Sequence, residues 1–487
     1  MKILPSVLLT VSCLLAGALP VFAQAEAAPV EAATLSATPA TLLDVFQDAR
    51  AFVNDAQETP EGATQLGLAE VVQRSIETSG RIKAAEELIV QREAQGAQAE
   101  SARKPQLASQ LQLAYLGGLK QEISSTPLAD LIIDVDGFKL GEAIVAANVT
   151  LQQVIYAGGK IGAAIRATNH LTESERLQRE ATLTTVALEA TRAYYETLLA
   201  KALVRVANES AETVQRHLAD ANKALEVGAV SRFEVIRAQT ELKAREADLA
   251  RALTADDVST LNLRRLTGLD GEGPLYLQPD WFTAATPAEA LDDIVAEAME
   301  KRPELNALGE TIAAAQEQVT VKRADGRPQV AGLMQYQHLE GAGDFIPQGF
   351  AATVGVRWDW YTGGRVKNQI MEAQSQVRQL EHQRHELERA VALDVRQSHI
   401  RSKEAAQRIL MQFATVQLAQ EGQSLADLRF QQGVGTQTET LDADLALVQA
   451  RTGLVQALGD YFIAQADLAK ASGRGWQPTS VGAPENQ

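Results

Sequence analysis

Few residues of this 487-residue sequence have a type and spacing that could support chemistry. Glu439 and Asp442 are the clearest pair, because they lie three positions apart in a segment that reads as helical. Side chains at positions i and i+3 share one face of a helix, so the two carboxylates project together, whereas the nearby Asp444 lies on another face. A solvated helix surface accounts for most such pairs, and the spacing alone leaves that alternative open.

A second pair, His382 and His385, is flanked by Glu381 and Glu386 and resembles part of a metal site. Zinc sites take at least three protein ligands, and no third ligand is evident, so helix-surface positions are the better interpretation. The sequence contains no G-x-S-x-G motif, Walker loop or cysteine-based site. We therefore expect a protein that is not an enzyme and that uses no cofactor or metal.

Composition and charge indicate an exported, helix-rich chain. Proline (15 residues) and aromatic residues (5%) are scarce, which suits long helices. The formal net charge of −17 argues against binding to nucleic acid, which needs a basic surface. The first residues resemble a secretory signal, with Lys2, an apolar core and a small-residue cleavage site before Gln24.

The only cysteine, Cys13, lies inside the apolar core of this signal. The apolar run continues past it, which argues against lipidation there, and disulfides in the mature chain are excluded. No later apolar run approaches 18 residues, so the sequence predicts no transmembrane helix. An exported chain without such a helix is a soluble periplasmic protein, a secreted protein or a membrane β-barrel.

The elements that must position these residues are duplicated at an offset of about 205 residues. Gly158 and Gly159 in VIYAGGK recur as Gly363 and Gly364 in WDWYTGGR, and both pairs join a strand to a helix. One large supersecondary unit was therefore duplicated, and its two copies are expected to pack side by side. The predicted organisation is a signal peptide (1–23), a flexible leader (24–63), repeat 1 (64–270), a linker (271–288), repeat 2 (289–473) and a C-terminal tail (474–487).

Each repeat is predicted to open with one helix, at 66–103 and 290–326, that stops before a proline. Two strands with alternating apolar and polar residues follow in each repeat. Each is about ten residues long, the length and period of a membrane-spanning strand. A half-buried strand of a soluble sheet is the alternative for any single one. The four predicted strands are 105–115, 143–154, 327–337 and 350–361.

The last predicted strand carries Trp358 and Trp360, which fit an aromatic girdle at a membrane interface. Four strands cannot close a barrel alone, and open edges in lipid leave backbone groups unpaired. If these strands span a membrane, several chains must share one barrel.

After Gly159 the sequence is predicted to be helical for about 65 residues, or roughly 100 Å. A heptad seam of mostly Ala, Val and Leu runs along this helix and predicts an antiparallel partner. Gly228 should end the helix and Ser231 should cap the returning one. The matching seam of repeat 2 is more polar, and we expect it to line a channel. Its polar positions are Ser398, Ser402, Gln412 and Gln423.

The duplicated order of proline-ended helix, alternating strands, Gly-Gly turn, long helix, Gly turn and GVGTQTETLDA segment resembles the TolC outer membrane efflux family. The resemblance covers about residues 64–473. It implies a mostly α fold with membrane β, in which a trimer pools twelve strands into an outer-membrane β-barrel continued by a long α-helical coiled-coil tunnel in the periplasm. It further implies an exit duct for small-molecule efflux or type I secretion, docked to a periplasmic adaptor and an RND or ABC inner-membrane pump.

The resemblance also implies a periplasmic gate near Glu439, Asp442 and Asp444, where threefold symmetry would bring the carboxylates of the trimer into rings. Family members lock this tip with an Arg–Asp–Tyr network. Here Glu234 can stand for the acid, but the tyrosine and arginine positions hold Phe430 and Gly435. A link between Arg237 and a carboxylate is our hypothesis for the replacement.

The same turns are where adaptors of the family dock, and small exposed residues there would let another helical tip approach the backbone. Glycines in hairpin turns are also needed for backbone geometry alone. The candidate docking residues are Val227, Gly228, Ala229, Val230 and Ser231 in repeat 1, and Gly433, Val434, Gly435 and Thr436 in repeat 2. The rival function is a soluble periplasmic coiled-coil adaptor or scaffold, which normally has one helical hairpin and lacks the four amphipathic strands.

Overall fold

The computed structural model describes residues 64–115, 143–271, 273–278, 290–340 and 349–475. The predicted signal peptide with Cys13, the leader and nearly all of the C-terminal tail lie outside the described residues. Within the described part, no helix is both long enough and apolar enough to cross a membrane.

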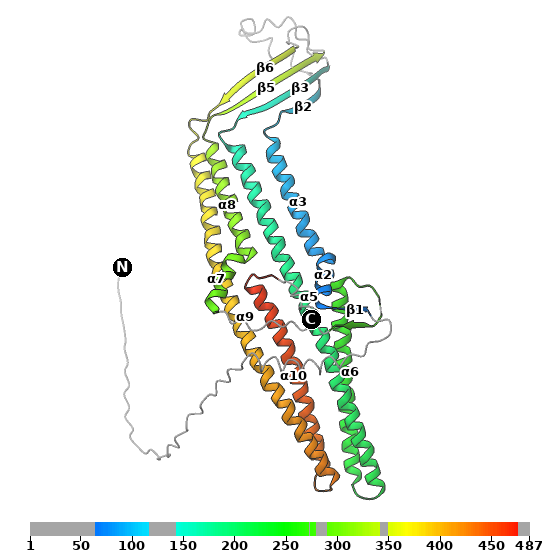
Figure 1. The fold of residues 1–487 in the computed structure, drawn as a ribbon. Coiled ribbons are helices and arrows are strands. Elements are labelled where there is room, and N and C mark those ends of the chain that lie inside the picture. The colour runs from blue at the N-terminus through cyan, green and yellow to red at the C-terminus, as the bar shows by residue number, and fades with distance from the viewer. Residues whose placement is uncertain (1–63, 116–142, 272, 279–289, 341–348, 476–487) are drawn as a thin grey trace, which may run out of the picture.

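The molecule is elongated, with a β-sheet at one end and the tips of two helical hairpins at the other (Figure 1). Two copies of one plan build it, and a short parallel pair of β1 (Thr64–Leu66) and β4 (Leu275–Leu277) lies at mid-length. Repeat 1 contains α2 (Leu68–Thr78), α3 (Gly80–Ser101), β2 (Gln106–Tyr115), β3 (Ala143–Tyr156), α5 (Lys160–Glu226) and α6 (Arg232–Thr267). Repeat 2 contains α7 (Leu291–Lys301), α8 (Pro303–Ala324), β5 (Gln329–Glu340), β6 (Gly349–Arg357), α9 (Arg365–Gln431) and α10 (Gln437–Ala471).

The predicted duplication is confirmed in detail. Helices α5 and α9 each have 67 residues. Helix α5 begins at Lys160 and α9 begins at Arg365, 205 positions later. Gly228 and Gly433 follow them with the same φ of 73°, a left-handed conformation that favours glycine. The same local sequence therefore ends both long helices and starts both return helices in the same way.

The opening helix of each repeat differs from the prediction, because it is divided into two. In repeat 2 the break falls at Arg302, whose φ and ψ are −64° and 120°. The next residue is Pro303, which disfavours helical geometry in the residue before it and starts α8. Repeat 1 breaks at the equivalent Ser79, which has nearly the same backbone angles without a following proline.

The four predicted strands form one antiparallel sheet in the order β2-β3-β5-β6. The last strand is shorter than predicted. Its final pair is Arg357 with Gln329, and the residue before Gln329 is Pro328, which has no N–H to continue the ladder. Trp358 and Trp360 therefore lie in the turn between strand and helix, outside β6.

Both layers of the molecule have two free edges, and these edges lie on the same two sides (Figure 1). The sheet ends at β2 and at β6. Near the sheet the helices pack in the order α3, α5, α8 and α9, and beyond mid-length in the order α6, α5, α10 and α9. The chain is therefore bounded by β2, α3 and α6 on one side and by β6 and α9 on the other.

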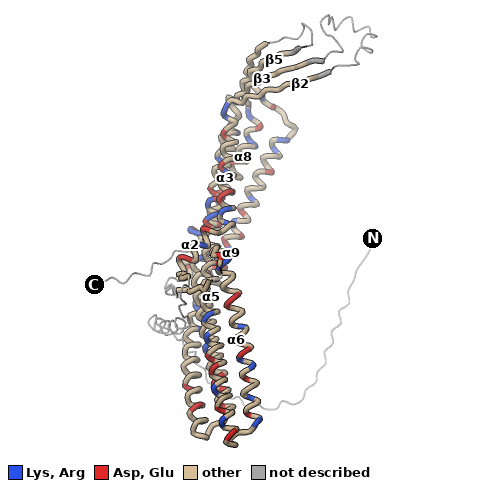
Figure 2. Tube along the Cα trace, turned by 90° about the vertical axis from the view of Figure 1, so that its right-hand side faces the viewer, with Lys and Arg blue, Asp and Glu red and all other residues tan. Residues whose placement is uncertain are grey.

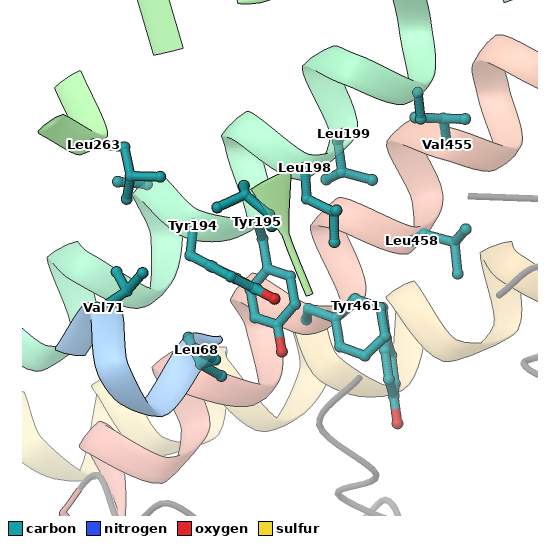
Figure 3. Close-up of a cluster of buried hydrophobic side chains, with 14 of the residues drawn as sticks. Leu68, Val71, Tyr194, Tyr195, Leu198, Leu199, Leu263, Val455, Leu458 and Tyr461 are labelled. Carbon is teal, nitrogen blue, oxygen red and sulfur yellow. The ribbon is translucent and has the colours of Figure 1, made fainter. Parts of the chain in front are cut away.

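The main core lies at mid-length, where α2, α5, α6, α9 and α10 meet. Tyr194 and Tyr195 of α5 point inward between Leu68 of α2 and Leu458 of α10 (Figure 3). The ring of Tyr195 stacks on Phe462 with ring centroids 4.9 Å apart. Such aromatic pairs contribute about 0.5–1.5 kcal/mol beyond the burial of their surface.

The expectation of a wet, channel-lining face on α9 is wrong for two of the residues on which it depended, Ser398 and Ser402. Ser398 and Ser402 are buried, and Ser402 Oγ accepts a hydrogen bond from Gln465 Nε2 at 3.0 Å. Gln412 lies over Gly453 of α10, and Gln423 bonds to α10 as described below. Ser402 and Gln423 thus find hydrogen-bond partners on α10 within the protomer, as buried polar groups generally do.

Candidate functional site at the hairpin tips

The α5–α6 turn exposes its backbone at the end of the molecule. Val227, Gly228, Ala229 and Ser231 are exposed and Val230 is half-buried. Backbone hydrogen bonds hold the turn, including Ala229 N to Ala224 O at 2.8 Å. Ser231 is the N-cap residue of α6, as predicted, although its side chain makes no capping bond.

The α9–α10 turn repeats this geometry and adds a second backbone bond to the same carbonyl. The amide groups of Val434 and Gly435 both donate to the backbone oxygen of Arg429, at 3.0 and 2.9 Å. A Cβ atom added to Gly435 would come within 3.0 Å of Arg429 and of Phe430 N. The packing of this turn therefore leaves little room for a side chain at Gly435.

Glu439 and Asp442 lie on the exposed side of α10, directly after this turn. Thr436 is the N-cap residue, and its hydroxyl accepts a bond from Glu439 N at 3.3 Å. The Glu439 carboxylate lies 3.5 Å from Arg429 Nε, and Asp442 has no ion pair within the described residues. The predicted shared face of the two carboxylates is thus present and accessible.

Asp444 has a different environment from the one that a gate residue would need. It is only 6% exposed, and one carboxylate oxygen lies 2.9 Å from His217 Nε2 of α5. The other oxygen accepts a bond from Gln423 Nε2 of α9 at 2.6 Å. Asp444 therefore joins α5, α9 and α10 inside the protomer and does not lie on the exposed face that Glu439 and Asp442 share.

The ionisation of this cluster is coupled. The Asp444 carboxylate favours the protonated imidazole and so raises the pKa of His217 above its ordinary value, against the opposing effect of burial. Burial raises the pKa of Asp427, and repulsion from Asp444 raises it further. Arg216 is the remaining charged group near both, and it lowers both pKa values.

Sequence reasoning missed His217, although a signal for this cluster exists. Asp444 occupies a position between Leu441 and Leu447, both of which are buried on the packed face of α10. A carboxylate on such a face needs a partner from a neighbouring helix, since a buried charge must be paired. A search for a histidine or arginine at the facing level of α5 would have found His217.

A polar cavity of about 270 Å³ adjoins this cluster between α5, α9 and α10. Glu209, Arg216, Gln423, Asp444 and Arg451 line part of it. Arg451 Nη1 of α10 lies 2.7 Å from Glu209 Oε2 of α5, so the cavity is bordered by a second ion pair between the same two helices. The contact between repeats is therefore polar on this side of the mid-length core.

Arg237 makes a link between the repeats, but not the predicted one. Its Nη1 donates to Thr438 Oγ1 of α10 at 2.6 Å, so a hydroxyl takes the place of the expected carboxylate. Glu234, one turn earlier on α6, has a buried oxygen, Oε2, without a hydrogen-bond partner within the described residues. The structure therefore brings Arg237 to repeat 2 and leaves Glu234 unlinked to it.

The two Gly-Gly turns lie at the opposite end, where the sheet meets the helices. Gly158, Gly159, Gly363 and Gly364 all have positive φ values, between 59° and 91°. A Cβ atom on Gly158 would lie 2.8 Å from Arg327 Cβ, so glycine is also required there for space. These glycines allow the sharp turn from strand to helix, and they lie far from the hairpin tips.

The predicted aromatic pair lies at the same junction. The rings of Trp358 and Trp360 are 5.0 Å apart, and Trp360 is 82% exposed. Trp358 Nε1 donates to Gly326 O at 3.3 Å. His382 and His385 are exposed on α9, and the described residues contain no group of three or more His, Cys, Asp and Glu side chains that could hold a metal.

The sequence matches the family described as outer membrane efflux protein over residues 71–269 and 294–474. The toluene efflux pump outer membrane protein TtgC of Pseudomonas putida is 24% identical over 317 residues, which cover 62% of this chain and 63% of that protein. Protein CyaE of Bordetella pertussis is 26% identical over 250 residues, which cover 50% and 53%. The chain thus spans less than two thirds of the length of these curated relatives.

Solved structures share the fold over nearly their whole length. CusC superimposes with a TM-score of 0.72 at 15% identity, covering 86% of this chain and 95% of CusC. The CmeC outer membrane channel of Campylobacter jejuni gives 0.71 at 16% identity, covering 85% and 86%. Both repeats, with their sheet and hairpins, therefore follow a known architecture.

Proposed function

Because the chain belongs to the outer membrane efflux protein family, its location is the outer membrane, and we propose that three copies form a passive exit channel there. The strands of each copy contribute to one shared barrel, and the long helices extend it as a tunnel into the periplasm. The channel is gated at the hairpin tips.

One observation carries this proposal: the free edges of the sheet and of the helical layer lie on the same two sides of the protomer (Figure 1). Unpaired backbone groups in lipid cost several kcal/mol each, so β2 and β6 must find partners. Pairing β6 of one copy with β2 of the next closes a ring, and three four-stranded sheets give twelve strands. Closure by identical copies also satisfies the usual preference for symmetric assemblies.

The free edge of the helical layer supports the same arrangement. Exposed apolar side chains recur along α9 at intervals of 7 or 11 residues, which places them on one face of the helix. This spacing is typical of a surface that packs on another helix. In the proposed trimer, α3 and α6 of the neighbouring copy cover this surface. The residues are Leu393, Ile400, Met411, Leu418 and Leu425.

At the tips, Glu439 and Asp442 of three copies would form rings of carboxylates at the narrow end of the tunnel. Such rings attract cations and disfavour anions. The exposed turns at Gly228 and Gly433 are the proposed docking sites for a periplasmic adaptor, which connects the channel to an inner-membrane pump. The pump supplies the energy, and no catalytic group is needed in this chain.

Efflux of small molecules is the favoured role, since three of the similar proteins are named outer membrane proteins of efflux pumps. Type I secretion of a protein substrate is the second candidate. The soluble adaptor is not favoured, because the family match spans both repeats.

The proposal is tested by fractionating cells that produce the full chain and by measuring the mass of the purified protein in native mass spectrometry. We expect the protein in the outer-membrane fraction with the mass of three chains. A soluble monomer would overturn the proposal. Pull-down of the native complex, followed by identification of the co-purified pump, separates the efflux role from the secretion role.

A further inference from the structure

The region where the sheet meets the helices is basic in an otherwise acidic protein. We define the junction collar as residues 101–105, 157–166, 321–328 and 357–368. These segments carry ten Lys and Arg residues against two carboxylates, Asp325 and Asp359, although the whole chain has a net charge of −17. Figure 2 shows the almost uncharged strands and the blue positions below them.

Strand pairing places the collar segments at one level. The register pairs Gln106 with Gln152, and Gln329 with Arg357, at the helix-facing end of the sheet. The segments that precede β2 and β5 and follow β3 and β6 therefore meet at one edge. Their basic residues therefore gather at one level of the molecule, where the sheet meets the helices.

Two guanidinium groups of the junction collar converge on one small space. The Nη2 atom of Arg103 and the Nη1 atom of Arg166 each lie 3.6 Å from the point that a Cβ of Gly162 would occupy. Glu317 binds Nε and Nη2 of Arg166, both at 2.8 Å, which leaves Nη1 directed to this space. The side chains of Arg103 and Lys104 make no hydrogen bond or ion pair within the described part of the chain.

Converging cations with only one neighbouring carboxylate repel each other unless an anion lies between them. The N–H groups of a guanidinium donate strong, charge-assisted hydrogen bonds to the oxygens of a phosphate diester, and Arg166 Nη1 and Arg103 can both donate here. Because Gly162 has no side chain, the space between the two groups stays open. The local chemistry therefore fits a phosphate group.

The adjoining surface decides which phosphate compound fits. The apolar strand surface begins directly beside the collar, where Leu107 is 71% exposed and Ile155 is 60% exposed. Free phosphate would gain nothing from that surface, whereas a lipid would place its acyl chains on the strands and its headgroup on Arg103 and Arg166. Exposed apolar area of this kind is stabilised by burial in lipid.

We propose that the junction collar is a binding surface for anionic phospholipid headgroups, with Arg103, Lys104 and Arg166 as its central residues. The proposal rests on the proposed membrane position of the sheet. It adds a lipid preference that the position alone does not require, since a neutral headgroup would serve an uncharged junction equally well. Basic residues near a bilayer surface attract anionic lipid, and salt weakens the attraction.

The test is electron paramagnetic resonance of spin-labelled phosphatidylglycerol and spin-labelled phosphatidylcholine with the full-length protein reconstituted in phosphatidylcholine bilayers. We expect the protein to associate with phosphatidylglycerol about threefold or more strongly than with phosphatidylcholine. The variant R103Q/K104Q/R166Q should lose most of this preference. The control variant R232Q/K243Q/R251Q removes the same number of positive charges from α6, far from the collar, and should keep the preference for phosphatidylglycerol.

The double variant R103Q/K104Q removes two side chains that make no described contact, so it keeps the fold intact and should still lower the preference. Equal association of the two lipids with the native protein would overturn the inference, as would a full preference in both variants. Insertion into bilayers without lipid preference overturns this inference alone. Failure to insert overturns the proposed function as well.

Discussion

His217 of α5 and Asp444 of α10 form an ion pair of 2.9 Å that joins the helical hairpins of the two repeats. The pair lies a few helical turns above the exposed tips, and Gln423 of α9 holds the second oxygen of Asp444 at 2.6 Å. Because the pair is largely buried, its strength depends on the protonation of His217. The contact between the repeats therefore responds to pH.

The first prediction concerns this response. The pKa of His217 is raised in the folded protein, so the pair stabilises the fold fully below the ordinary histidine pKa of about 6.5 and loses this effect as the pH rises through the raised value. The pKa of Asp427 is raised too, so its ionisation also weakens the fold as the pH rises. His217→Gln should lower the unfolding temperature most at about pH 6 and least at about pH 8.5.

His382→Gln, at an exposed position on α9, is the control and should show no such pH dependence. Thermal unfolding followed by circular dichroism across this pH range checks the prediction. A destabilisation by His217→Gln that stays constant with pH would contradict it. Removing one partner of a largely buried ion pair costs at most about 3–5 kcal/mol, which bounds the effect at low pH.

Two helical glycines with different surroundings give the second prediction. A Cβ on Gly459 of α10 would collide with Leu199 Cδ1 of α5, whereas a Cβ on Gly309 of α8 meets nothing within 4 Å. Gly459→Ala should destabilise the protein by about 1–3 kcal/mol through overpacking. Gly309→Ala should stabilise it by about 0.5–1 kcal/mol, because alanine favours the helix. Equal shifts in unfolding temperature would show that α5 and α10 are not in this close contact.

Arg237 gives the third prediction, because its bond to Thr438 ties α6 to α10 beside the tips. Arg237→Ala should raise the single-channel conductance in planar bilayers, since the hairpins separate more easily, and Thr438→Val should do the same. Arg232→Ala removes a neighbouring exposed charge from α6 and should leave the conductance unchanged. Unchanged conductance in the Arg237 and Thr438 variants would remove this contact from the gate.

The exposed carboxylates of α10 give the fourth prediction. The variant E439Q/D442N should lower the selectivity for cations over anions, measured from the reversal potential in a salt gradient, because it neutralises the proposed rings. E372Q/E381Q removes two exposed charges near the opposite end of α9 and serves as the control. If both variants keep the native selectivity, the narrowest part of the channel lies elsewhere.

The repeated architecture was predictable because its signals are local. The Gly-Gly turns, the alternating strands and the long seams each determine one element, and the offset of 205 residues relates the two copies. The breaks at Ser79 and Arg302 were missed, although Pro303 indicated the second one. The end of β6 at Arg357 depends on its partner strand, which periodicity within β6 cannot show.

The site was predicted less completely, because its contacts join segments far apart in the chain. The exposed face shared by Glu439 and Asp442 follows from spacing on one helix. The partners of Asp444 and Arg237 lie 227 and 201 positions away, and only tertiary packing selects His217 and Thr438. The exposure of Ser402 was mispredicted for the same reason, since its partner Gln465 on α10 is not visible in the heptad seam itself.

The central claim, that copies of this chain form one channel, is tested most directly by planar-bilayer recording of the purified full-length protein. The account predicts discrete, cation-selective current steps whose size is set at the hairpin tips and increases when the contact between Arg237 and Thr438 is removed. A protein that inserts into the bilayer as a trimer but gives no current steps, in the native form and in Arg237→Ala alike, would contradict it.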